Sequence, residues 1–346
     1  MRELADNILR DPRFKRWLVE NSPAIGAPIA IKRFSGGQSN PTFALTATGG
    51  SFVLRRKPEG PLLKGAHAIE REVRVQAALG KAGFPVPEIV ALCEDPDILG
   101  TPFYLMSLVE GRLFWDSTFA DAPAAERPRL FDAMGETLAR LHAISPETIG
   151  LADFGRPAHY LARQIERWSS QYRADVEAGR IAELDAIADW LPGVVPPDEP
   201  GRIVHGDFRV DNLIFAPDRP EVLAVIDWEL SSLGHPLADF AYHLMMYRLP
   251  PTFPGGLLGL DLGASGIPPE EDYVERYCER TGRVSANNLE IYLCYNIFRF
   301  AAIIHGIKGR MLRGNASSPE AAKLADQLPA IARIAIEQAR RAGMPR

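Results

Sequence analysis

A dense group of polar residues, HGDFRVDN, occupies positions 205–212 between two short apolar stretches. His205, Asp207 and Asn212 have the spacing H-x-D-x-x-x-x-N, which is typical of a loop that catalyses phosphoryl transfer. In such a loop the aspartate accepts the proton of the attacking hydroxyl group, and the asparagine binds magnesium. We therefore predict that Asp207 is the catalytic carboxylate and that Asn212 is a metal ligand. His205 is expected to be structural and to bond nearby backbone.

A second carboxylate follows at the end of the apolar stretch VLAVI, at Asp227. Phosphoryl transfer needs oxygen ligands that hold magnesium on the phosphates, so Asp227 is predicted to be the second metal ligand. Arg209 is predicted to place a positive charge on the transferring phosphoryl group. Glu229 either assists the metal or caps a turn, and the sequence does not separate these readings. Taken alone, Asp207 and Asn212 also suit ordinary Asx turns.

The elements that must position these residues change character near residue 110. Residues 25–110 predict a small antiparallel β lobe with one helix at 67–80. From 123 onward the pattern is mainly helical, except at 202–228, and a Gly/Pro-rich loop spans 249–269. We predict an α+β fold of two lobes with a cleft between them. The predicted parts are an N-terminal helix (1–24), a β-rich nucleotide-binding lobe (25–110) and a mainly helical lobe with the catalytic loop and acceptor site (111–346). Among the helices, one is expected near 236–248, one near 285–312 and one near 317–343.

Composition excludes several classes of function. Hydrophobic residues make up 46% and charged residues 24% of the chain, as in ordinary globular proteins, and the net charge is −5. This balance gives no reason to expect nucleic-acid or membrane binding. The three cysteines lie far apart, which suits a reducing compartment, and no stretch is long and apolar enough to cross a bilayer. We expect a cytoplasmic protein; its oligomeric state is open.

Five large side chains are expected in the core rather than at a ligand: Trp115, Trp168, Trp190, Met245 and Met246.

The two segments VHGDFRVDNLIF and VIDWELSSLGHPLADFA occur in the order and at the distance found in one enzyme family. The chain resembles the aminoglycoside phosphotransferase/choline kinase family, which has a protein-kinase-like fold. The stretches FVLRRKP, HAIEREVRV and RGNASS resemble most closely the subgroup related to kinase-like domains fused to acyl-CoA dehydrogenases. The resemblance covers residues 25–310 and implies that the second segment binds magnesium and that Asp239 braces the catalytic loop.

The nucleotide would be held by the β-rich lobe. Arg55 stands where the family has a cation for the ATP phosphates, and Glu72 stands where it has the glutamate that holds this cation; a surface ion pair is the alternative. The turn FSGGQSN lacks the spacing G-x-G-x-x-G, and it is either a phosphate-covering loop or a plain hairpin turn. The segment LMSLVEG resembles the hinge whose backbone reads the adenine. The remaining candidates for nucleotide contacts are Gly36, Gly37, Ser39, Leu108 and Val109.

These features predict a kinase that uses ATP and Mg²⁺ to phosphorylate a hydroxyl group of a small molecule. Because Lys308, Arg310 and Arg313 are the only charges in residues 303–315, an anionic or neutral acceptor such as a hydroxy acid or a hydroxyacyl thioester is favoured over a polycation. Arg310 and Arg313 are the pair expected to point inward; a solvated helix face is the alternative. An aminoglycoside or amino-alcohol kinase and a catalytically inactive, nucleotide-binding pseudokinase stay open. A protein kinase is disfavoured because SSLGHPLADFA follows Asp227 too closely for an activation loop.

Overall fold

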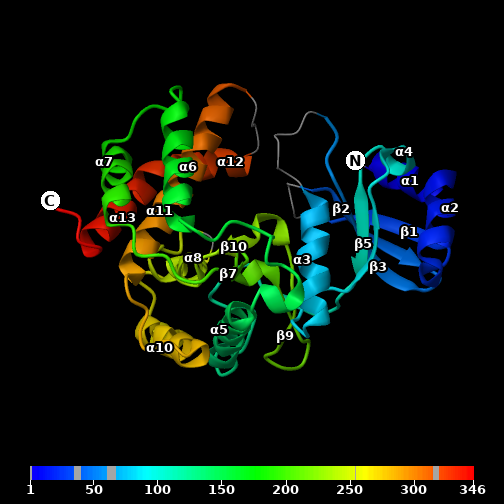
Figure 1. Ribbon diagram of the computed structural model, residues 1–346, viewed down its shortest axis with the longest axis horizontal. Helices are drawn as coiled ribbons and strands as arrows, with labels where there is room; N and C mark the ends of the chain where they lie inside the picture. The colour runs from blue at the N-terminus through cyan, green and yellow to red at the C-terminus, as the bar shows by residue number, and fades with distance from the viewer. Residues whose placement is uncertain (1, 35–39, 61–67, 254, 315–318) are drawn as a thin grey trace. The chain divides into compact units, whose positions relative to one another are not determined.

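The structure is a computed structural model that describes residues 2–34, 40–60, 68–253, 255–314 and 319–346 (Figure 1). The chain forms two compact units. Unit 1 comprises Met1–Leu113, Ile149–Leu151 and Asn212–Ser231, and unit 2 comprises Phe114–Thr148, Ala152–Asp211 and Ser232–Arg346. Unit 1 thus takes in a segment from the second half of the chain, whereas the predicted parts 1–24, 25–110 and 111–346 are continuous and stay a prediction.

Unit 1 is built on a five-stranded antiparallel sheet with the strand order β1-β2-β3-β5-β4. Its strands are β1 (Pro28–Arg33), β2 (Thr42–Ala47), β3 (Gly50–Arg56), β4 (Ile89–Cys93) and β5 (Phe103–Ser107). Side chains alternate between its two faces, as expected for a sheet covered on both sides. Phe103 and Leu105 pack with the N-terminal helices, whereas Tyr104 and Met106 pack with Ile69 of helix α3 (Ile69–Lys81). Figure 1 shows the sheet between α3 and the N-terminal helices.

The N-terminal segment forms two helices rather than the one predicted, α1 (Arg2–Arg10) and α2 (Pro12–Asn21). Asp11 interrupts them because its carboxylate accepts the backbone N–H of Arg13 and caps α2, which begins at Pro12. A short helix, α4 (Pro96–Leu99), follows β4.

A second, three-stranded sheet of unit 1 has the order β6-β8-β9 and carries the predicted metal ligands. Its strands are β6 (Arg112–Leu113), β8 (Leu213–Phe215) and β9 (Val222–Val225). Gly111 precedes β6 and lies so close to β8 that a Cβ there would be 2.3 Å from the Phe215 carbonyl oxygen. Only glycine permits this approach.

Unit 2 is mainly helical and centres on α11 (Leu289–Leu312), which packs against α6 (Tyr160–Ala174), α8 (Pro236–Leu244) and α13 (Leu328–Arg341). A two-stranded sheet of β7 (Arg202–Val204) and β10 (Ser232–Gly234) precedes α8. The α+β class, with a small antiparallel β unit and a larger helical one, is therefore confirmed. The remaining helices are α5 (Arg127–Ala143), α7 (Ala182–Trp190), α9 (Leu262–Ser265), α10 (Glu270–Thr281) and α12 (Pro319–Asp326).

The predicted helices at 236–248 and 317–343 are each shorter than expected. Helix α8 ends at Leu244 and a 3₁₀ turn, Met245–Tyr247, follows. The last helix is divided at Gln327, where α13 begins with Leu328 and Pro329, because proline cannot continue the hydrogen bonding of a preceding helix. In the described part of the chain, no helix has the length and apolar character that crossing a membrane requires.

Candidate active site

The catalytic loop of unit 2 begins directly after β7, where the backbone turns sharply at Gly206. The φ angle of Gly206 is +82°, a conformation that glycine adopts without strain. This turn directs the N–H groups of both His205 and Gly206 at the carboxylate of Asp239, each at 2.8 Å. The Gly206 carbonyl accepts a bond from Arg299 Nη2 at 2.9 Å. The loop is thus held through both the N–H group and the carbonyl group of Gly206.

Asp239 is buried in the first turn of α8, where the helix dipole favours a negative charge. Its Oδ2 also bonds His142 Nε2 at 3.2 Å, and His142 Nδ1 bonds the Tyr277 hydroxyl at 2.7 Å. Burial acts to raise the pKa of the Asp239 carboxyl, but the hydrogen bonds from His142 and from the backbone of His205 hold it below its usual range. Asp239 is therefore an ionised brace for the loop, at the position that the family resemblance implied.

The predicted catalytic carboxylate, Asp207, is 22% exposed at its side chain. Its Oδ1 accepts a hydrogen bond from the Tyr242 hydroxyl of α8 and lies 3.3 Å from Arg209 Nε. Its backbone N–H donates to Nδ1 of the fully buried His205 at 3.2 Å, so His205 bonds backbone as expected. The pattern of polar residues did not reveal Tyr242, although it lies three residues after Asp239 and thus near it on the helix surface.

Arg209 lies between two carboxylates of its own loop. Its Nη2 bonds Asp211 Oδ2 at 2.8 Å, and its Nε faces Asp207. The Arg209 side chain remains 45% exposed. The structure thus places Arg209 next to the predicted catalytic aspartate, and its role toward a phosphoryl group stays a prediction.

In unit 1, the hairpin of β8 and β9 brings the two predicted metal ligands together. Leu213 pairs with Val225 in antiparallel register, so the residues that flank this pair, Asn212 and Ile226, lie opposite each other. The Ile226 N–H donates to the Asn212 carbonyl at 3.0 Å. Asp227 follows with φ +67°, a left-handed conformation that is uncommon outside glycine and clusters at functional sites.

Arg55 of β3 lies among three carboxylates. Its Nε is 2.9 Å from Glu72 Oε2, and its Nη2 is 2.7 Å from Asp227 Oδ1 and 3.5 Å from Glu229 Oε2. Burial acts to lower the pKa of Arg55, but the attraction of Glu72 and Asp227 outweighs it and raises this pKa. The predicted Arg55–Glu72 pair is thus present and buried, not a surface pair, and Asp227 joins it from a distant part of the chain.

Glu72 is buried on α3 and has two more partners, neither of which the sequence revealed. Asn40 Nδ2 donates to Oε1 at 2.9 Å, and the Tyr104 hydroxyl donates to Oε2 at 3.0 Å. Burial raises the pKa of Glu72 to about 7, against the opposing effect of the Arg55 charge. These bonds fix the carboxylate that orients Arg55.

Other predicted nucleotide contacts are less defined. Gly36, Gly37 and Ser39 lie outside the described residues. Leu108 and Val109 follow the end of β5, and the Leu108 N–H donates to the Ser51 carbonyl at 3.3 Å. Their contact with a nucleobase stays a prediction.

The basic residues near the end of α11 do not form the inward-pointing pair that we expected. Arg313 makes two bonds to the Asp175 carboxylate, at 2.8 and 2.9 Å. Lys308 donates to the Ala178 carbonyl at 2.9 Å, and Arg310 is exposed. The prediction failed because Asp175 is distant in sequence but adjacent in the fold, so residues 303–315 alone did not show the charge balance.

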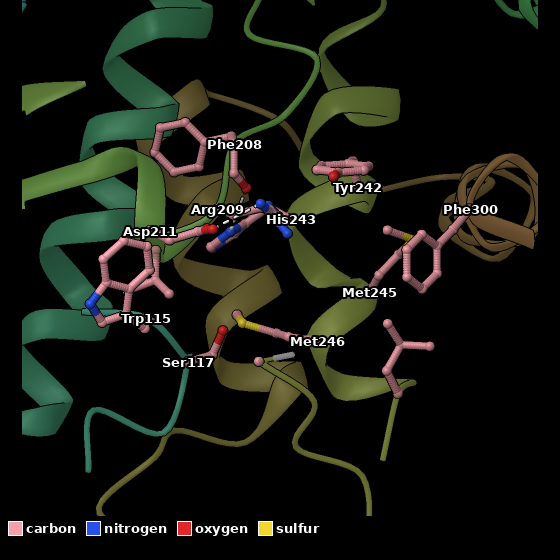
Figure 2. Close-up of a pocket in the computed structure, with 13 residues that line it drawn as sticks. Trp115, Ser117, Phe208, Arg209, Asp211, Tyr242, His243, Met245, Met246 and Phe300 are labelled. Carbon is pink, nitrogen blue, oxygen red and sulfur yellow. Dashed lines mark hydrogen bonds and ion pairs between the residues drawn. The ribbon is translucent and has the colours of Figure 1, made fainter. Parts of the chain in front are cut away.

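A pocket of unit 2 adjoins the catalytic loop (Figure 2). Figure 2 shows Phe208, Arg209 and Asp211 of the loop on one side, with Tyr242 and Met245 on the other. Its walls are largely aromatic and thioether side chains, and Asp211 is the single carboxylate among the lining residues that the structure describes. Met245 and Met246 are buried as expected, but Trp115 is 67% exposed at the pocket and does not belong to the core. The other lining residues are Ser117, Val210, His243, Leu249, Gly255 and Phe300.

The comparisons with known proteins identify the class of this site. The model of the phosphotransferase enzyme family matches residues 30–285, and the chain belongs to this family. The predicted membership of a phosphotransferase family is thereby confirmed.

The chain is 41% identical over 318 residues to acyl-CoA dehydrogenase family member 10 from Mus musculus, covering 91% of this chain and 30% of that protein. The chain thus spans less than a third of this relative, and the resemblance to kinase-like domains fused to acyl-CoA dehydrogenases is confirmed. A putative aminoglycoside phosphotransferase from Ralstonia eutropha JMP134 is 41% identical with a TM-score of 0.87, covering 95% of this chain and 98% of that one.

A thermostable mutant of the aminoglycoside phosphotransferase APH(4)-Ia, solved with ADP and hygromycin B, has the same fold. Its TM-score is 0.56 at 17% identity, covering 92% of this chain and 98% of that one. At this identity the similarity concerns the fold alone.

Proposed function

We propose that the chain transfers the γ-phosphoryl group of ATP to a hydroxyl group of a small molecule, with Mg²⁺ as the metal. The observation that carries the proposal is the position of Arg55, held by Glu72 on α3 and in contact with Asp227. An ion pair between a strand cation and a helix glutamate, with a metal-binding aspartate nearby, is the arrangement that kinases need in order to hold nucleotide phosphates.

The charges of this cluster fit a nucleotide–magnesium complex. One guanidinium lies near three carboxylates, which leaves negative charge for a divalent cation to balance. Asp227 is 30% exposed, and Arg55 binds its Oδ1. Mg²⁺ takes one or two carboxylates and completes its shell with phosphate oxygens and water, so one carboxylate and one amide are a sufficient set of protein ligands. When bound, magnesium would neutralise charge on the phosphates; Asn212 and Asp227 would hold it.

The residues of the chain then have separate tasks. Arg55 binds the phosphates, and Glu72 orients Arg55. Asp207 orients the acceptor hydroxyl and receives its proton, while the braced loop keeps Asp207 in place. Arg209, whose exposed side chain lies beside Asp207, would stabilise the negative charge of the transferring phosphoryl group.

For the acceptor, we propose a molecule with an apolar part and a neutral or anionic group, such as a hydroxy acid or its thioester. The pocket beside the loop supports this choice, because its walls are mostly apolar, and Asp211, the carboxylate among the lining residues that the structure describes, is already paired with Arg209. A polycationic acceptor would need unpaired carboxylates there. The basic residues near the end of α11 do not support this choice, because Arg313 is paired with Asp175.

An acceptor screen tests the proposal. Purified protein with Mg²⁺ and ATP, or GTP in parallel, is given hydroxy acids, hydroxyacyl-CoAs, amino alcohols and aminoglycosides, and nucleoside diphosphate is measured. We expect diphosphate formation that depends on a hydroxy acid or a hydroxyacyl thioester. Preference for aminoglycosides would overturn the acceptor class. Nucleotide binding without turnover on any acceptor would favour the pseudokinase.

A further inference from the structure

We infer that Tyr242 is a positioning residue for phosphoryl transfer: its hydroxyl orients the Asp207 carboxylate, and Arg299 holds both Tyr242 and the loop. The inference rests on the proposed role of Asp207. The direct contact is the hydrogen bond that the Tyr242 hydroxyl donates to Asp207 Oδ1. Because Arg209 also faces Oδ1, both contacts act on the same oxygen and fix the rotation of the carboxylate about its Cβ–Cγ bond.

The hydroxyl of Tyr242 stays protonated and therefore remains a donor. Burial and the charge of Asp207 both raise the pKa of Tyr242. A neutral phenol that donates to a carboxylate makes a charge-assisted hydrogen bond, which is shorter and stronger than a bond between neutral groups. Tyr242 thus constrains Asp207 without competing with it for the proton of the acceptor.

Arg299 of α11 connects this contact to the loop backbone. Its Nη2 donates to the Gly206 carbonyl, one residue before Asp207. Its guanidinium carbon also lies 5.0 Å from the centre of the Tyr242 ring, within the range of a cation–π interaction. Arg299 therefore contacts both the peptide that precedes Asp207 and the ring that contacts its carboxylate. Together the two side chains fix the position of Asp207 from α8 and α11.

The test is a double-mutant cycle in which Tyr242→Phe is made alone and together with Asp207→Ala. The phenylalanine keeps the ring over Arg299 and removes only the hydroxyl. We expect Tyr242→Phe to lower kcat about 10-fold, the scale of one charge-assisted hydrogen bond, with KM for ATP unchanged. In the Asp207→Ala background the same change should have little further effect, because its partner is gone. Turnover is measured with Mg·ATP and the best acceptor of the screen, or with water as acceptor.

Tyr247→Phe is the matched control. Tyr247 follows α8, is buried, and donates its hydroxyl to the Pro268 carbonyl at 2.9 Å, away from the loop. This variant should lose stability but keep kcat. The inference is overturned if Tyr242→Phe leaves kcat unchanged or lowers it equally with and without Asp207.

Two further measurements separate failure of this inference from failure of the proposed function. If Asp207→Ala itself turns over like wild type, the proposed role of Asp207 fails. If wild type shows no turnover, the same four proteins are compared by urea denaturation. If the Tyr242 hydroxyl and Asp207 interact, Tyr242→Phe lowers the midpoint of urea denaturation only when Asp207 is present. Equal shifts of the midpoint in both backgrounds contradict the hydrogen bond between Tyr242 and Asp207.

Discussion

Arg55 is the cation at the centre of a cluster of acidic side chains in unit 1. It contacts Glu72 of α3 and both Asp227 and Glu229 of the segment that follows β9, so three acids surround one cation. A partly buried cluster with excess negative charge is unfavourable unless a cation compensates it, and the proposed Mg²⁺ would supply that positive charge.

We expect the variant Asp207→Asn to lose turnover but to keep its affinity for nucleotide. Replacing Asp207 with Asn removes the proton acceptor but keeps the side-chain shape and the acceptor oxygen for Tyr242. Turnover should fall roughly 10²–10⁴-fold, the range of a positioned general base. Nucleotide affinity, measured by calorimetry, should be unchanged. Activity within a few-fold of wild type would remove Asp207 from the reaction.

We expect that magnesium no longer tightens nucleotide binding in the variant Asp227→Ala. Asp227→Ala removes the carboxylate proposed as a metal ligand, so titrations with ATP at low and high Mg²⁺ should give the same Kd. Asp218→Ala is the control: Asp218 lies in the turn of the same hairpin, with a side chain that is 73% exposed, and its variant should keep the magnesium effect. An unchanged magnesium dependence in Asp227→Ala would reject the ligand assignment.

At the scale of elements, α8 contributes three neighbouring polar side chains to one loop. Asp239 bonds the loop backbone, Tyr242 bonds Asp207, and His243 Nδ1 donates to the Phe208 carbonyl at 3.3 Å. Because a carbonyl only accepts, the proton of His243 is on Nδ1, and Nε2 accepts from the Tyr273 hydroxyl at 2.8 Å. Helix α8 thus supports the loop at its backbone and at Asp207, in addition to the bonds within the loop and the bond from Arg299.

Removing the buried charge of α8 should destabilise the fold. In Asp239→Asn, the amide group presents a donor toward loop N–H groups that need acceptors. We expect a loss of roughly 2–4 kcal/mol in the free energy of unfolding, measured by urea denaturation. The matched control is Asp272→Asn, an exposed acid in the first turn of α10, which should change stability little. Equal effects of the two variants would contradict the bracing role.

The buried His243 predicts how stability depends on pH. Burial lowers its pKa from 6.5 to about 4, so between these pH values the unfolded chain binds more protons than the folded one. The stabilising contribution of neutral His243 is therefore complete above pH 6.5 and is lost as pH falls toward 4. A shift of 2.5 units corresponds to about 3 kcal/mol. In His243→Gln the decline over this range should shrink accordingly; in His159→Gln, at an 81% exposed site, it should not. Parallel curves for wild type and His243→Gln would contradict this.

The sequence predicted much of this arrangement, for identifiable reasons. Strands such as β3 and β5 follow from apolar runs between turn residues, and Asp207, Asn212 and Asp227 follow from their spacing. The division of the N-terminal helix at Asp11 depends on a cap that periodicity does not report. Tyr242 was not predicted as a partner of Asp207, because a tyrosine in an apolar helix is usually a core residue. Contacts such as Arg313 with Asp175 were missed because they join distant segments.

At the scale of the whole molecule, the chain changes unit within the motif that defines its chemistry. Asp207 belongs to unit 2, whereas Asn212 begins the segment 212–231 of unit 1. Pairing of β8 with β6 and β9 explains this division. The proposed proton acceptor and the proposed metal ligands are thus braced independently, Asp207 by α8 and Asp227 by the Arg55 cluster. We expect variants of one set to leave the binding properties of the other intact.

The central claim, direct transfer from ATP to a hydroxyl group, is tested by following the label of γ-labelled ATP. Wild-type protein, Mg²⁺ and the acceptor found by the screen are incubated, and labelled products are separated. The account predicts label on the acceptor as a phosphate ester, with one ADP formed per ester and almost none with Asp207→Asn. Label found only as inorganic phosphate, or on the protein itself, or equal ester formation by Asp207→Asn, would contradict it.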